Sequence, residues 1–366
     1  MNTATTSESD RERRAALVIA RRDASLVARA IRCVPMLYAA GADETLDRPA
    51  HVRAASGLAW VGERLAVVQD DAQFVALVDP ATGEAEASPL PPGRGGVRQF
   101  DDSRGNKGDK LDLEGLTSVP GADGSLLLAM GSGSTARREH VAVIGGLGSS
   151  RVTIAMRRLP SFFAALRETV HFAGSELNVE GVLYVDGRLR LFGRGNGAAR
   201  GGILPVNATC DVSWAALMAH IEQPRSSKAP TPAAVVRYDL GAIGGVPLSF
   251  TDAALVRTEG GVQRTLYTAA AESSPSATLD GVVAGAAIGV IEESDEGHLA
   301  RWTELVDRDG LPVPWKIEGI AALPADRARA FVAIDRDEHD RASELCEVEL
   351  LGPWYDGSPQ PFRRGG

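Results

Sequence analysis

The sequence has few of the residues that mark disulfide-rich, zinc-binding or membrane-spanning proteins. Its three cysteines, Cys33, Cys210 and Cys346, are far apart and form no Cys-x-x-Cys pair. This spacing argues against a disulfide framework or a structural zinc site, and we expect each cysteine to be a small buried side chain. No uncharged hydrophobic run reaches the length of a membrane span, so the sequence predicts no membrane segment.

An excess of positive charge is also absent. The chain has 39 lysines and arginines against 48 aspartates and glutamates, a formal net charge of -9. A general nucleic-acid-binding protein needs a basic face, so this balance argues against that class. Residues 1–14 are polar, and we expect them to form a disordered tail. The apolar stretch at 15–20 is too short for a signal peptide, and we therefore expect a cytoplasmic protein.

Glycine, in contrast, is abundant. The 40 glycines and 20 prolines, without a long helical pattern, are typical of many short strands joined by tight turns. The sequence therefore predicts an all-β fold. We expect one domain over residues 15–352, with a short helical insertion at about 203–230, followed by a C-terminal tail at 353–366.

The chain is organised around a short strand motif that recurs. From Lys110 to Leu116, polar and apolar residues alternate as in a half-buried strand, with Glu114-Gly115 at the centre. Glu-Gly returns at Glu180 and Glu318. Degraded copies occur at Ser56 and Asp252, so that the motif positions are separated by 58, 66, 72 and 66 residues.

After each motif come a turn, an apolar strand, a polar loop and another apolar strand. The repeat lengths suit four-stranded blades and predict a β-propeller, with five blades favoured and six as the alternative. The last repeat shows only three strands. The apolar residues 32–38 would supply the fourth strand and close the ring. In the third repeat, we expect the third strand at 233–238 and a helix at 212–221 capped by Asp211.

The predicted architecture brings distant residues together. The first strand of every propeller blade lines the central channel, and the second strand runs antiparallel to it. The motif residues and the loops after the second strands should therefore meet on one face. Those loops contribute Asp70, Ser132, Arg194, Asn196, Glu272, Asp335 and Arg336. Side chains two positions before the motif share its side of the strand, and these are Ala54, Asp112, Asn178, Phe250 and Lys316. Residues 101–112 predict a loop over the channel mouth.

Carboxylates that face one channel repel one another unless they are protonated or neutralised by cations. Lysines and arginines of the chain are one source of positive charge, and a hard metal ion is another. Oxygen ligands suit calcium, magnesium or manganese, and the scattered histidines and cysteines disfavour zinc. We predict as metal ligands Glu114, Glu180, Asp252, Glu318 and Asn178. We predict as ligands of a small anionic substrate Arg194, Asn196, Arg336, Lys110, Asp335 and Asp112.

From Ala54 to Leu350 the chain resembles the phytase-like and gluconolactonase-like β-propellers. The resemblance rests on the repeated Glu-Gly motif, with Asn178 and Asn196 as possible oxygen ligands, and it departs from the pattern at Ser56 and Asp252. It implies calcium in the channel and hydrolysis of phosphate esters or lactones. No histidine is placed as the base of a lactonase.

Two functional hypotheses follow. The first is a metal-assisted hydrolase of a small phosphoester or lactone, and the second is a non-catalytic propeller that binds a ligand or protein through the same face. A structural explanation of the motif is also open. In it, the acidic residue accepts backbone N–H groups of the neighbouring blade, and the glycine permits close packing.

Overall fold

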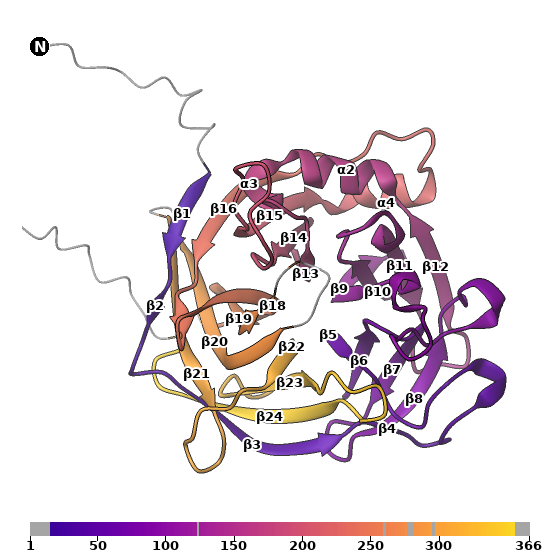
Figure 1. Ribbon diagram of the computed structural model, residues 1–366, viewed down its shortest axis with the longest axis horizontal. Helices are drawn as coiled ribbons and strands as arrows, with labels where there is room; N and C mark the ends of the chain where they lie inside the picture. The colour runs from indigo at the N-terminus through magenta and orange to yellow at the C-terminus, as the bar shows by residue number, and fades with distance from the viewer. Residues whose placement is uncertain are drawn as a thin grey trace, which may run out of the picture.

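The computed structural model describes residues 15–122, 124–258, 261–274, 276, 281–294 and 297–355. The predicted disordered tail at 1–14 lies outside these residues. The described chain is all-β, and its antiparallel strands are arranged around a central axis as in a β-propeller (Figure 1). None of the helices in these ranges is long and apolar enough to cross a membrane.

Each of the predicted repeats forms an antiparallel meander of strands. The first contains β5 (Ala55–Val61), β6 (Arg64–Gln69), β7 (Phe74–Val78) and β8 (Glu84–Pro89). The second contains β9 (Leu113–Gly121), β10 (Gly124–Gly131), β11 (His140–Gly145) and β12 (Thr153–Arg158). The third contains β13 (Val179–Val185), β14 (Arg188–Gly193), β15 (Asn207–Ser213) and β16 (Ala233–Asp239). The fourth contains β18 (Val246–Arg257), β19 (Gln263–Ser273), β20 (Val282–Ser294) and β21 (Gly297–Val306).

The last repeat combines both ends of the chain. It contains β22 (Lys316–Ala322), β23 (Arg329–Asp335), β24 (Glu344–Leu351) and, antiparallel to β24, the N-terminal strand β3 (Val27–Pro35). The sequence predicts this fourth strand at residues 32–38, and β3 begins five residues before that range.

Short strands and helices complete the structure. Four short strands pair at sheet edges, and these are β1 (Ala16–Ile19), β2 (Arg21–Arg22), β4 (Leu37–Tyr38) and β17 (Ala242–Ile243). The α-helices are α2 (Pro160–Glu168), α3 (Val170–Ala173) and α4 (Trp214–Glu222). Single 3-10 turns lie at Glu44–Leu46, Arg94–Gly96, Lys107–Asp109 and Ala136–Arg138.

The pairing of β3 with β24 corrects the expectation for two cysteines. Cys33 and Cys346 lie directly opposite each other in the register, and their sulfur atoms form a disulfide. They are 313 residues apart in the sequence, so no local spacing could indicate the pair. Cys210 is a free buried side chain, as expected.

The third repeat also differs from the prediction. Its third strand is β15, so residues 233–238 belong to the fourth strand, β16. Asp211 does not cap a helix. It lies in β15, where its carboxylate accepts hydrogen bonds from Arg188 (3.0 Å) and Arg190 (2.8 Å). The helix α4 begins three residues later than Asp211, and Ser213 caps it by accepting a bond from the Ala216 N–H.

The motif glycines let the inner strands approach one another closely. A Cβ atom on Gly57 would lie 2.5 Å from the Glu114 carbonyl oxygen, and one on Gly115 would lie 2.9 Å from the Val182 side chain. The inner strands β5, β9, β13, β18 and β22 are in contact in this order, and β22 is again in contact with β5. Close packing is therefore one reason for the recurrence of the glycine.

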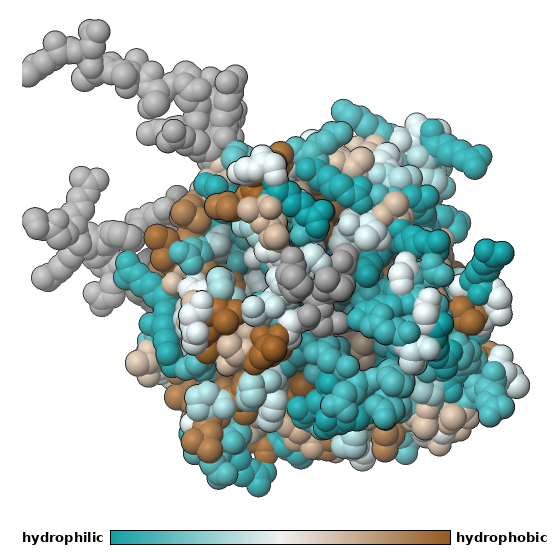
Figure 2. All heavy atoms as spheres, in the orientation of Figure 1, coloured by the Kyte–Doolittle hydropathy of each residue, from teal (hydrophilic) through white to brown (hydrophobic). Residues whose placement is uncertain are grey.

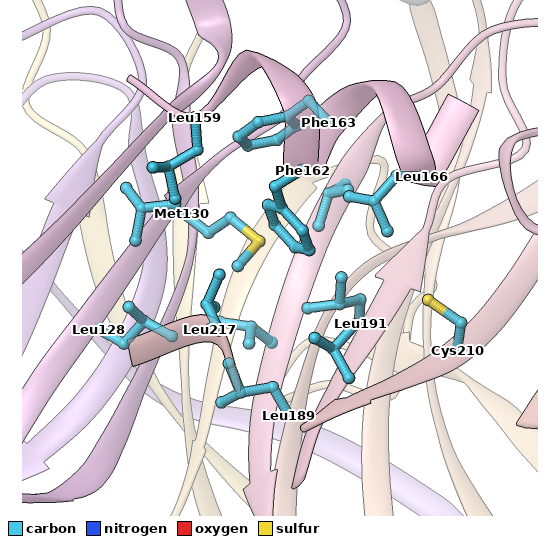
Figure 3. Packing of buried hydrophobic residues seen from close by; sticks show 14 of the residues in the cluster. Leu128, Met130, Leu159, Phe162, Phe163, Leu166, Leu189, Leu191, Cys210 and Leu217 are labelled. Atoms are coloured by element: carbon cyan, nitrogen blue, oxygen red, sulfur yellow. The ribbon is translucent and has the colours of Figure 1, made fainter. Parts of the chain in front are cut away.

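The apolar core lies between neighbouring meanders. Figure 3 shows the cluster between β10 and β14, where Met130 and Leu191 pack with Phe162 and Leu166 of α2 and Leu217 of α4. These helices therefore cover the outside of the second and third repeats and do not reach the axis. At the other end of the chain, Trp354 is buried in a separate cluster, so packing extends into the expected C-terminal tail.

Candidate functional site

The glutamates of the motif lie at β-bulges. In β9, Leu113 pairs with Gly131 and Gly115 pairs with Met130, so Glu114 is an extra residue between them. The same irregularity leaves Glu180 and Glu318 unpaired in their strands. A bulge changes the direction of a side chain relative to the regular strand. The three bulged glutamates line one cavity near the axis.

The register of the fourth repeat shows why Asp252 is different. Phe250 pairs with Ala269 and Asp252 pairs with Thr268, so Thr251 is the bulged residue. Asp252 therefore occupies the position of the motif glycine. It is fully buried, and its Oδ2 atom accepts a hydrogen bond from the Ile320 N–H at 2.9 Å. The prediction of Asp252 as a metal ligand is thus corrected, because a shift of one residue turns the side chain away from the cavity.

We call the axial cavity the inner pocket, and its volume is about 40 Å³. Figure 2 shows hydrophilic residues beside the centre of this face of the molecule. The lining carboxylates are Asp70, Asp112, Glu114, Glu180, Glu272, Glu318 and Asp335. The lining cationic side chains are Lys110, Arg138, Arg194 and Lys316. Neutral polar groups come from Ser56, Asn178, Asn196 and Ser274. The structure thus brings together all the predicted site residues except Asp252 and Arg336.

Arg336 lies outside the pocket for a simple reason. It follows Asp335 at the end of β23, and neighbouring side chains of a strand point to opposite faces. Its guanidinium group forms an ion pair with Glu344 and lies 5.6 Å from the centre of the Trp315 ring. The prediction that Arg336 binds substrate in the channel is therefore corrected.

Lys110 and Arg138 concentrate positive charge on one acid, Asp112. The Lys110 Nζ atom lies 2.8 Å from Asp112 Oδ1 and also forms an ion pair with Asp70. Arg138 donates a hydrogen bond of 2.8 Å to the other Asp112 oxygen. Burial opposes ionisation, but these two cations lower the pKa of Asp112 below its ordinary value. Asp112 is therefore a carboxylate anion at neutral pH.

Arg194 is another buried cation of the inner pocket. Its side chain is 6% exposed and pairs with Glu272, with Glu180 at 3.4 Å and with Glu318 at 3.7 Å. Asn178 donates a hydrogen bond of 2.6 Å to Glu180. Burial opposes the charge of Arg194, but the surrounding glutamates raise its pKa. One guanidinium group thus serves three acids.

Glu114 receives the least compensation. Within the described ranges, no lysine or arginine nitrogen lies at ion-pair distance from its carboxylate. Burial, followed by the negative charges of Asp70, Glu180 and Asp112, raises the pKa of Glu114 well above its ordinary value. Burial likewise raises the pKa of Asp70 to about 7, although Lys110 opposes the change. The inner pocket therefore holds more acid than its own cations neutralise.

A second cavity of about 140 Å³, which we call the outer chamber, adjoins the inner pocket. Asp70, Lys110, Lys316 and Asp335 line both spaces and so form their boundary. The rest of the outer chamber is lined by Arg53, Ala54, Asp71, Phe100, Asp101, Asp102, Ser103, Lys107, Asp337, Glu338 and His339. Residues 101–103 and Lys107 belong to the loop predicted at the channel mouth.

Arg53, which organises this chamber, was not among the residues predicted for the site. The side chain is 2% exposed and donates hydrogen bonds to Asp71 (3.1 Å), Gln99 (2.9 Å) and Asp101 (3.2 Å). It therefore ties the loop before β9 to the first repeat. Arg53 precedes the first motif by three residues, but nothing in its local sequence distinguishes it from a surface arginine.

The residues near the boundary fit a hard cation. Asp70, Asp112 and Glu114 each place a carboxylate oxygen within 4.8 Å of the other two. Such oxygen ligands suit calcium or magnesium. Of the predicted metal ligands, only Glu114 belongs to this group, while Glu180, Glu318 and Asn178 line the same pocket. Lys110 already pairs with two members of the group, so an ion there competes with its ammonium group.

Comparisons with solved structures give only distant similarities. The chain is similar to Drosophila Semaphorin 1a, extracellular domains 1-2, at 8% identity and a TM-score of 0.32, with 82% of this chain and 86% of that chain covered. It is similar to the Cps50 (Swd1) β-propeller domain of Myceliophteria thermophila at 11% identity and a TM-score of 0.31, with coverage of 81% and 96%. It is also similar to the Cellvibrio cellulosa alpha-L-arabinanase at 8% identity and a TM-score of 0.29, with coverage of 65% and 91%.

None of these three is described as phytase-like or gluconolactonase-like. No protein with a curated description matches the chain. A family model, in contrast, matches residues 51–350, which include all five motif positions but not the N-terminal strand β3. The chain belongs to the Family of unknown function (DUF6929).

Proposed function

We propose that the inner pocket binds a hard divalent cation (calcium, magnesium or manganese) and that a small anionic ligand binds next to it. The observation that carries this proposal is the charge imbalance of the pocket, where seven carboxylates face four cationic side chains. Buried carboxylates that lack a counter-charge are costly, and a bound cation removes that cost. Asp70, Asp112 and Glu114 would hold the ion.

The proposal depends on a ring-shaped domain. We infer five blades, each formed by one of the meanders, with β3 as the outer strand of the last blade. The contact between β22 and β5 and the pairing of β3 with β24 support this arrangement. A closed ring explains why acids from repeats that are far apart in the sequence share one axial pocket.

The proposed chemistry is hydrolysis of a phosphoester or a lactone. A bound divalent cation would polarise a phosphoryl or carbonyl oxygen and lower the pKa of a bound water. The chain itself supplies Lys110 and Lys316 to hold an anionic group. Turnover of phosphate-ester and lactone panels with added cation separates a hydrolase from a binding protein.

The direct test is thermal unfolding of the chelator-treated protein with and without each ion. A ligand at one hundred times its Kd stabilises the folded state by about 2.7 kcal/mol, so binding should raise the Tm of the wild type by several degrees. Glu114→Gln keeps the shape of the side chain but removes a ligand charge, and it should reduce this shift. Glu63→Gln, on an exposed turn, is the matched control. The proposal is overturned if none of the three ions raises the Tm.

A further inference from the structure

The two cavities differ in what they hold. A single water needs roughly 10–15 Å³ of such volume, and a cavity of about 150 Å³ accommodates benzene. The inner pocket, at about 40 Å³, therefore has room for an ion with a few waters. The outer chamber, at about 140 Å³, has room for a group the size of a six-membered ring. The body of an organic ligand thus belongs in the outer chamber, beyond Lys110 and Lys316.

Lys110 connects the two spaces. Its ammonium group pairs with Asp70 and Asp112, which are two of the three acids that fit a cation. The same residue lines the outer chamber. Asp70 and Asp112 have limited negative charge to share, so ligation of an ion by these acids weakens their attraction for Lys110. The ammonium group is then a better partner for an anion in the outer chamber.

We propose that the two compartments are coupled through Lys110: cation binding in the inner pocket strengthens the binding of an oxyanion, carried by a ring-sized polar ligand, in the outer chamber. This inference rests on the proposed cation site. Lys316 is the second cation at the boundary, where it lies 3.7 Å from Asp335 and 3.8 Å from Glu318. A phosphate and a carboxylate share the chemistry that two lysines recognise.

Unsatisfied buried atoms support the inner half of this site independently of the acid group. Glu318 is 5% exposed and Arg194 is 6% exposed. In the pocket that both line, Glu318 Oε2 and Arg194 Nε have no hydrogen-bond partner among the residues that the structure describes. Buried polar atoms are nearly always satisfied in folded proteins. The pocket therefore offers more polar contacts than the chain itself uses.

Coupling of this kind must be reciprocal. If the cation increases oxyanion affinity by some factor, the oxyanion increases cation affinity by the same factor, typically 5–150-fold. Lys110 competes with the cation but contacts the oxyanion. Removing its charge should therefore change the affinities for the two ligands in opposite directions. Lys110→Met deletes the charge that competes for Asp70 and Asp112, so cation affinity should rise. It also deletes an oxyanion contact, so oxyanion affinity should fall and lose its dependence on the cation.

The experiment is calorimetric titration of inorganic phosphate, and separately of acetate, into the whole protein at constant ionic strength. Each titration is done with chelator and with saturating magnesium, which avoids the insoluble calcium salt. We expect magnesium to tighten binding of at least one of the two anions by about 5-fold or more. The anion that responds identifies the class of oxyanion. Lys228→Met, an exposed loop substitution, is the control and should keep the coupling.

The outcomes separate the two proposals. If no divalent cation binds, the proposed function fails. If magnesium binds but neither anion responds to it, the coupling alone is overturned. Lys110 is buried, so its variant is first checked for folding. If the variant does not fold, the coupling is tested by the reciprocal measurement on the wild type, in which magnesium is titrated with and without the anion. The anion must increase magnesium affinity by the same factor by which magnesium increases anion affinity.

Discussion

Gly319 of the last repeat lies against Ser56 of the first. A Cβ atom on Gly319 would be 2.2 Å from the Ser56 carbonyl oxygen, far inside the distance at which atoms touch. Both residues belong to inner strands, β22 and β5, at opposite ends of the chain. This contact is where the two ends of the repeat array meet beside the axis.

Gly319→Ala should therefore destabilise the protein. The obstructing atom is backbone, which cannot rotate away, so a strand must move, and overpacking of this kind costs about 1–3 kcal/mol. Denaturant unfolding measures the loss. Gly108→Ala is the matched control, because a Cβ atom there meets nothing within 4 Å. Equal stabilities of the two variants would show that β22 and β5 do not pack as closely as the structure has them.

Much of the site could be predicted because the repeat is visible in the sequence. Recurrence of Glu114, Glu180 and Glu318 at one position of the strand pattern was enough to place them around one axis. The error at Asp252 has a physical origin. A bulge adds one residue to a strand, and the sequence does not show whether Thr251 or Asp252 is that residue.

Contacts between segments that do not repeat could not be predicted. Arg53 is buried because Asp71, from the turn after β6, and Gln99 and Asp101, from the loop before β9, meet around its guanidinium group. The Cys33–Cys346 pair depends on the register between β3 and β24, which is fixed only once the first and last segments meet. Periodicity carries no information about either relationship.

Glu114→Gln should change how stability depends on pH when no divalent cation is present. The folded state holds the pKa of Glu114 well above its ordinary value of 4.5. The group therefore contributes stability below that value and loses it as the pH rises toward the folded pKa. Glutamine cannot ionise and avoids this loss. The Tm of the variant relative to the wild type should therefore increase as the pH rises above about 5.

Magnesium provides the control for this measurement. A bound cation stabilises the ionised form of Glu114, so the advantage of the glutamine variant should shrink or reverse when the ion is added. A constant difference in Tm across the pH series would mean that folding does not raise the pKa of Glu114.

Removal of the Cys33–Cys346 disulfide should lower stability. The bond joins strands from the two ends of the chain and closes a loop with a sequence separation of 313 residues. Disulfides typically contribute about 2–4 kcal/mol, mainly by restricting the unfolded chain. The double variant Cys33→Ser, Cys346→Ser should unfold at lower denaturant concentration. A reductant should destabilise the wild type by a similar amount and leave the double variant unchanged.

The redox conditions of the compartment in which the protein resides decide whether the Cys33–Cys346 disulfide forms and stabilises the fold. Thiols remain reduced in the cytoplasm, whereas disulfides persist in oxidising compartments. Mass spectrometry of alkylated protein from its native source would give the oxidation state. Wild-type protein that is insensitive to reductant would contradict a stabilising disulfide.

Asp252→Ala should destabilise the fold without affecting cation binding. The substitution leaves the buried Ile320 N–H without its acceptor, which costs about 1–3 kcal/mol. Asp252→Asn retains a carbonyl oxygen of the same shape and should lose less. In both variants, magnesium should raise the Tm by the same amount as in the wild type, whereas Glu114→Gln should reduce that rise. Loss of the magnesium response in Asp252→Asn would show that Asp252 is a metal ligand, because the asparagine preserves the hydrogen bond and removes only the charge.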